Sequence, residues 1–124
     1  MTLGPLLHPI ILMKTLSKNH GEFRLKIPKD LAYFEGHFPD FPVVPGVVQL
    51  HWVIEFAQGI FTLPPITGQG SQIKFSQLMR PLDEVDLILD YCPLQSTLTY
   101  RYKTDEKIYS SGKFTYASVL EKMG

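Results

Sequence analysis

The sequence predicts an α+β fold in which an antiparallel sheet is wrapped around one long hydrophobic helix. The helix is indicated by residues 46–61, which lack proline and carry Glu55 as their single formally charged residue. The sheet is indicated by segments on both sides of this stretch in which apolar and polar residues alternate, as in half-buried strands. Since several folds place one helix on an antiparallel sheet, these patterns define the class and no more.

Two strands and one short helical turn are predicted before the helix. Residues 10–16 form a first candidate strand, and apolar and basic side chains alternate over residues 23–27 until Pro28 ends the pattern. Asp30 is placed to cap a short helical turn over residues 31–34. The chain then enters a proline-rich stretch that leads to the helix.

The predicted helix is apolar around most of its circumference. Its apolar residues fall on two faces, the first formed by Val47, Leu50, Ile54 and Phe61 and the second by Val48, Trp52 and Phe56. A helix of this kind has to be surrounded by other elements, and we expect Trp52 in the core rather than beside a cofactor.

Four predicted strands follow the helix, over residues 73–76, 85–91, 97–103 and 108–116. The period of two in the last strand places Ile108 on the same face as Phe114. Short connections, such as Asp105-Glu106 between the last two strands, favour a meander in which each strand pairs with the next.

Length and composition limit the classes of protein that the chain can represent. Its 124 residues suit a single domain over residues 1–124, and its 12 basic and 12 acidic residues give no electrostatic reason to expect nucleic acid or an anionic membrane. Cys92, as the only cysteine, excludes an intrachain disulfide. The apolar residues 3–13 lack signal-peptide features, and no run approaches the ~20 apolar residues of a spanning helix. We expect a cytoplasmic protein without membrane insertion.

The segment between Gly36 and Val47 is the part of the sequence that points to chemistry. Its three prolines stiffen a non-helical stretch that can hold the His37 side chain in place. Histidine titrates near neutral pH, which makes His37 a candidate general base. Gly46 and Val47 begin the helix, where unpaired N–H groups at the positive end of the dipole suit a carbonyl oxygen that gains negative charge.

The segment GHFPDFPVVPGVVQLHW resembles the active-site signature of the FabA and FabZ type dehydratases, which act on 3-hydroxyacyl chains carried by acyl carrier protein. Within it, PGVVQLHW resembles the ApeI-like subgroup linked to aryl-polyene lipid synthesis. The resemblance is strongest from Tyr33 to about Gln58, and the first twenty residues match poorly.

The resemblance implies a hot-dog fold and an obligate homodimer with two sites at its interface, where His37 faces a helix residue of the other protomer. It implies a thioester of acyl carrier protein or coenzyme A as substrate and partner, and no cofactor. It also implies that Phe38, Pro45, Gly46 and Val47 contact the acyl thioester.

The sequence departs from the family at two helix positions. His51 stands where the family has its acidic residue, fourteen positions after the histidine, and Glu55 stands where a glutamine is common. We therefore expect His37 to remove the C2 proton, the Gly46 N–H to stabilise the enolate oxygen and His51 to protonate the departing hydroxyl. Glu55, one helical turn after His51, would keep that imidazole protonated.

Two alternatives stay open on the same residues. A hot-dog thioesterase would use a carboxylate, for which Glu55 is the candidate on the helix, whereas a non-catalytic acyl-binding subunit would have lost its acid at position 51. His8 and His20 have no neighbours at metal-ligand spacing, so we interpret both as surface residues and expect no metal site.

Overall fold

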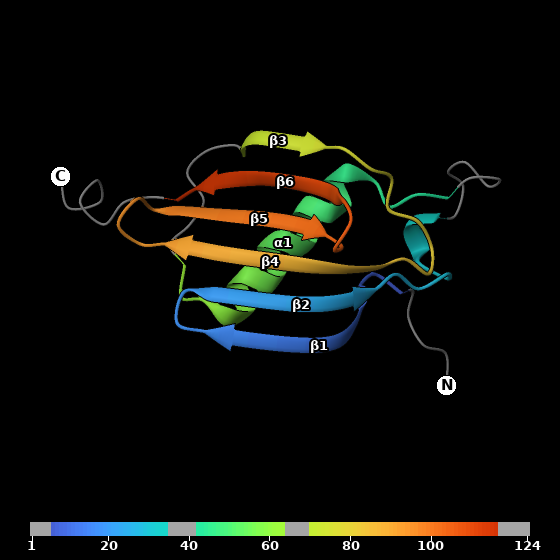
Figure 1. The fold of residues 1–124 in the computed structure, drawn as a ribbon, viewed down its shortest axis with the longest axis horizontal. Helices are drawn as coiled ribbons and strands as arrows, with labels where there is room; N and C mark the ends of the chain where they lie inside the picture. Colours follow the sequence, from blue (N-terminus) through green and yellow to red (C-terminus); the bar gives the residue numbers. More distant parts are fainter. Residues whose placement is uncertain (1–5, 35–41, 64–69, 117–124) are drawn as a thin grey trace.

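The computed structural model describes residues 6–34, 42–63 and 70–116 and confirms the α+β class. One long helix lies against a curved antiparallel sheet, and the order of elements follows the predicted one (Figure 1). The elements are β1 (Ile10–Ser17), β2 (His20–Lys26), the 3-10 helix η1 (Ala32–Phe34), α1 (Gly46–Ile60), β3 (Ser71–Phe75), β4 (Glu84–Cys92), β5 (Thr97–Lys103) and β6 (Ile108–Thr115).

The expected meander is right for β4, β5 and β6 and wrong for β3. In the described part of the chain the sheet has the order β1-β2-β4-β5-β6-β3, with every neighbouring pair antiparallel. The connection between β3 and β4, residues 76–83, is longer than a hairpin turn, so it does not force these strands to pair. β3 is short and takes the far edge beside β6, while the longer and more buried β4 takes a central place beside β2.

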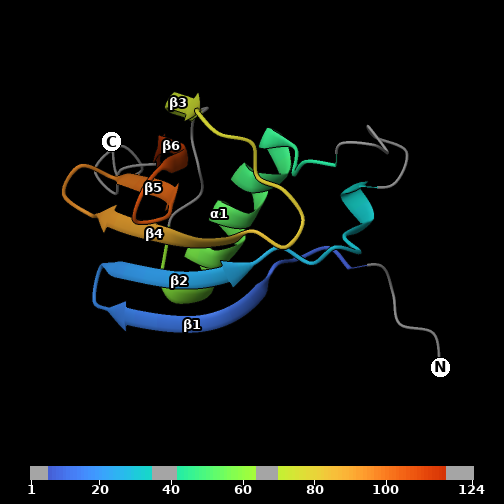
Figure 2. The same cartoon turned by 45° about the vertical axis from the view of Figure 1, so that its right-hand side comes forward.

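The core lies between the concave face of the sheet and α1, which crosses the sheet diagonally (Figures 1 and 2). Each central strand sends alternate side chains into it, as the period of two predicts. The expected core positions of Trp52 and of the strand aromatics are confirmed, since Trp52, Tyr100 and Tyr102 are at most 1 % exposed. None of the helices among the described residues is long and apolar enough to cross a bilayer.

The helix is covered on one side only, and the prediction of a fully surrounded helix is therefore wrong for the single chain. Val48, Trp52, Val53 and Ala57 are buried against the sheet, whereas Val47 is 73 % exposed. The physical reason is that a six-stranded sheet curls around one side of α1, and among the described residues no other helix or strand covers the opposite side (Figure 2).

Candidate functional site

Two of the predicted site residues, His37 and Phe38, lie outside the described residues. The described part of the motif resumes at Pro42 and is anchored at Val44. Val44 is buried, its N–H donates to the carbonyl of Met79 at 2.8 Å, and its own carbonyl accepts from Gln49 Nε2 at 3.2 Å. The chain just before the helix is therefore held from the β3–β4 connection and from the first turn of α1.

Pro45 is the N-cap of α1 and organises the first turn. With φ −59° and ψ 146° it is extended, and its carbonyl accepts from the N–H groups of Val48 and Gln49, each at 3.1 Å. Among the described residues, the N–H groups of Gly46 and Val47 have no hydrogen-bond acceptor. These two are the orphan donors at the positive end of the helix, where the sequence predicted donors for an oxyanion.

Gly46 has a packing role as well. A Cβ at this position would lie 2.7 Å from Cζ of Phe75, so the helix can start this close to β3 because residue 46 has no side chain. Tight packing and a donor role for its N–H are compatible, because one concerns the missing side chain and the other the backbone.

His51 and Glu55 form the polar pair that their spacing predicted. They lie one turn apart on the open side of α1, with His51 Nε2 2.5 Å from Glu55 Oε1. The His51 side chain is 61 % exposed and that of Glu55 38 %, so the pair meets solvent in the single chain. The contact places the carboxylate of Glu55 directly beside the His51 imidazole.

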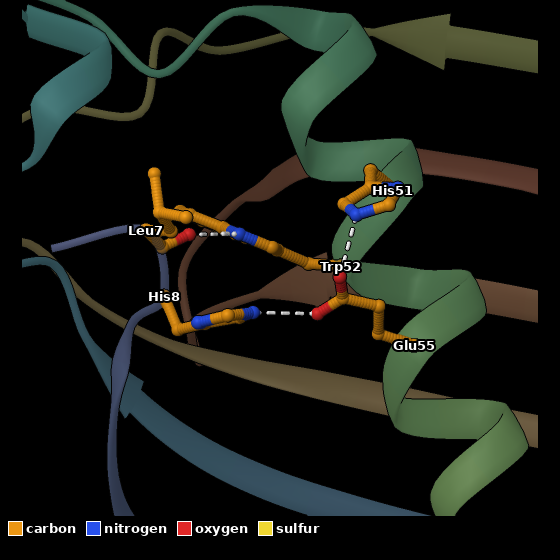
Figure 3. A network of polar contacts seen from close by, with 5 residues as sticks. All are labelled: Leu7, His8, His51, Trp52 and Glu55. Carbon is orange, nitrogen blue, oxygen red and sulfur yellow. Dashed lines mark hydrogen bonds and ion pairs between the residues drawn. The ribbon is translucent and has the colours of Figure 1, made fainter. Parts of the chain in front are cut away.

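His8 joins this pair, which sequence reasoning missed. Its Nε2 lies 2.7 Å from Glu55 Oε2, so the carboxylate contacts one imidazole through each oxygen (Figure 3). His8 was expected to be a surface residue, and its side chain is indeed 57 % exposed. The expectation did not include its contact with Glu55. The two residues are 47 positions apart, and no local pattern could have paired them.

A neighbouring helix residue fixes the segment that carries His8. The indole Nε1 of Trp52 donates to the carbonyl of Leu7 at 2.9 Å, on the side of α1 that faces the N-terminal segment (Figure 3). His8 and Glu55, with Pro9, Ile11 and Phe56, line a pocket of about 250 Å³. Within the described residues, no group of three or more His, Cys, Asp or Glu side chains is arranged to hold a metal ion.

Comparison with known proteins identifies the family of the chain. The family model for ApeI-like proteins, described as ApeI dehydratase, matches residues 13–113. Among curated proteins, the chain is 26% identical over 127 residues to the 3-hydroxyacyl-[acyl-carrier-protein] dehydratase FabZ of Streptococcus suis, which covers 91% of this chain and 90% of that relative. The FabZ of Natranaerobius thermophilus is 24% identical over 129 residues and covers 90% of this chain and 89% of its own length.

Solved structures agree. The chain is similar to the dehydratase heterocomplex ApeI:P from Xenorhabdus doucetiae, with a TM-score of 0.81 and 28% identity over 87% of this chain and 96% of that chain. An uncharacterised protein from Erwinia carotovora subsp. atroseptica follows, with a TM-score of 0.72 and 29% identity over 92% and 99% of the two chains. The hot-dog fold that the motif implied is thereby confirmed. From its family match, its sheet order and its central helix, the chain belongs to the ApeI-like dehydratase family.

Proposed function

We propose that the chain is a dehydratase that converts a 3-hydroxyacyl thioester to the trans-2-enoyl thioester and water, in fatty-acid or aryl-polyene-type lipid synthesis. Its family and the names of its FabZ relatives support this reaction. The observation that carries the proposal is the contact between His51 and Glu55, because it pairs a carboxylate with the side chain that stands at the position of the family's acid.

The first half of the reaction is assigned to the segment that precedes the helix. His37 takes the C2 proton, and the electron pair left on C2 is delocalised onto the thioester oxygen. The N–H groups of Gly46 and Val47 point out of the first turn of α1, and hydrogen bonds from them would stabilise that oxygen as it becomes an enolate. Phe38, Pro45 and Val47 are assigned to contact with the thioester, and the exposure of Val47 supports its place in this set.

The second half is assigned to the open side of α1. As the double bond forms between C2 and C3, the C3–O bond breaks and His51 gives its proton to the departing hydroxyl, which leaves as water. Glu55 favours the imidazolium form of His51 before this transfer, because its carboxylate contacts Nε2 directly.

The substrate and partner are assigned to a thioester carried by acyl carrier protein or coenzyme A. We infer that a second copy of the chain covers the open side of α1 and completes the site. The exposure of Val47 on the helix and of Phe75 on the edge strand β3 supports such an interface, since both are large apolar side chains. The ApeI:P neighbour is a heterocomplex, so light scattering on the purified chain alone is the measurement that checks self-association.

A mass-spectrometric assay of the purified protein tests the proposed function. A panel of 3-hydroxyacyl and 2-enoyl thioesters is followed for loss and gain of water, with His37→Ala as the test variant and His20→Gln as the matched control. We expect reversible interconversion that disappears in His37→Ala and persists in His20→Gln. Release of free thiol from a saturated acyl thioester would instead show a thioesterase, and tight acyl binding without turnover would show a non-catalytic subunit.

A further inference from the structure

Hydrogen bonds hold the N-terminal segment in place at the two residues that precede His8. Leu7 accepts a hydrogen bond from the Trp52 indole at 2.9 Å, and the carbonyl of Leu6 accepts from the N–H of Ala32 at 2.9 Å. Pro9, which follows His8, is buried and has a restricted backbone. Backbone contacts on one side and a buried proline on the other thus place the His8 imidazole over Glu55 (Figure 3).

A second contact is needed to keep the Glu55 carboxylate in the orientation that pairs with His51. A glutamate side chain has three rotatable bonds, and at 38 % exposure this carboxylate can turn toward solvent at little cost. With the contact between Oε1 and His51 alone, one exposed ion pair would oppose these rotations. The second contact, between Oε2 and His8 Nε2 at 2.7 Å, restricts the carboxylate from the opposite end.

We propose that His8 is a positioning residue, whose imidazole holds the Glu55 carboxylate in the orientation that pairs with His51. The proposal rests on the proposed function, in which His51 is the acid and Glu55 keeps it protonated. His8 acts through Glu55 and is assigned no contact with the acyl thioester.

The charges around Glu55 define what His8 has to do. In the described part of the chain, the titratable groups that contact this carboxylate are His51 on its own helix and His8 on the N-terminal segment. Ile11 and Phe56, which line the same pocket, carry no charge. An imidazole Nε2–H can donate a hydrogen bond to a carboxylate without carrying a charge, and this is the role proposed for His8.

The test compares His8→Ala with His8→Gln, whose amide keeps a neutral donor near the position of Nε2. Histidine side chains are labelled with ¹⁵N, and the pH midpoint of the His51 ring titration is followed by NMR without substrate. The pH profile of turnover is measured on the same variants, where loss of activity at high pH reports deprotonation of the acid. His20→Gln is the control for removal of an exposed histidine that pairs with carboxylates elsewhere.

We expect His8→Ala to move both the His51 midpoint and the basic limb of the profile downward by roughly 0.2 to 0.7 pH unit, which corresponds to exposed ion-pair energies. His8→Gln should recover at least half of that shift, and His20→Gln should show none. No shift in His8→Ala, or an upward shift caused by removal of a competing cation, would overturn the proposal. If wild-type protein has no turnover, the proposed function fails, and the ring titration alone then decides the role of His8.

Discussion

The two sides of α1 show how one helix serves both the fold and the site. The side that faces the sheet carries Val48, Trp52, Val53 and Ala57, all buried. The open side carries Val47, His51 and Glu55, all at least a third exposed. Residues of the two sides interleave along the helix, so adjacent positions such as His51 and Trp52 have different surroundings and different assigned roles.

The difference is one of burial and polar pairing. On the sheet-facing side Tyr102 Oη donates to the carbonyl of Gln49 at 2.7 Å and Gln49 Nε2 donates to that of Val44, whereas Gln49 Oε1 is buried without a partner among the described residues. The polar side chains of His51 and Glu55 on the open side contact each other and solvent, and the proposed mechanism assigns the proton transfer to this side. Substitutions on the first side should therefore change stability, and those on the second should change turnover.

The largest effect is expected from Trp52→Ala. This substitution removes a fully buried indole and its hydrogen bond to Leu7, and should lower the free energy of unfolding by about 3–5 kcal/mol. Urea denaturation measures the change. Trp52→Phe keeps most of the ring and should cost clearly less, and a loss below about 1 kcal/mol in Trp52→Ala would contradict the assignment of this side to the fold.

Gly46→Pro comes next, because it removes the N–H donor while leaving the helix start allowed. Proline suits the first helical position, and the extended backbone of Pro45 is what a residue before proline requires. We expect turnover to fall by about 10²–10³, the effect of losing one oxyanion donor. Gly46→Ala is the matched control, since its Cβ meets the same Phe75 ring but its N–H remains. Equal turnover in both variants would exclude the donor role.

A smaller effect separates two tyrosines of the core. Tyr102→Phe loses the hydrogen bond to Gln49 and should lower the free energy of unfolding by about 0.5–1.5 kcal/mol. Tyr116 Oη is buried without a hydrogen-bond partner among the described residues, and burial raises the pKa of this phenol to about 12. Tyr116→Phe should therefore be neutral or stabilising. The difference in denaturation midpoint between the two variants checks this, and a greater loss in Tyr116→Phe would refute it.

The smallest effect concerns pH and the far end of the sheet. The hydrogen bond that His20 donates to Asp90, with a further contribution from Glu22, raises the pKa of His20. The His20 imidazolium thus contributes stability at pH values below its unfolded pKa, and this contribution is lost as pH rises through the folded pKa. Both side chains are more than a third exposed, so the contribution should stay below about 1 kcal/mol. In Asp90→Asn the pH dependence of the melting temperature should flatten across that window; an unchanged profile would argue against the pair.

Sequence patterns predicted those parts of the fold that follow from local periodicity. β2, β4 and β5 bury alternate residues, so their period of two was visible, and the helix was visible because it lacks proline and has one formally charged residue. The partner of β3 was not predictable, because pairing with β6 is a long-range contact. A register shift between Tyr102 and Lys103 also places Tyr109 in the core and leaves Ile108 46 % exposed, so the predicted face is wrong at Ile108. It is right further along β6, where Phe114 is buried.

The site divides in the same way. The contact between His51 and Glu55 follows from their spacing of four residues on a helix, so the sequence was sufficient to predict it. The contact between His8 and Glu55 depends on how the N-terminal segment folds back over α1, and spacing along the chain contains no information on that.

The most direct test of the division between the two sides of α1 is to measure turnover and stability on one preparation of His51→Ala. Because this side chain is exposed and assigned to proton transfer, turnover of a 3-hydroxyacyl thioester should fall by about 10²–10⁴. The free energy of unfolding should stay within about 0.5 kcal/mol of wild type. Turnover within twofold of wild type would contradict the account.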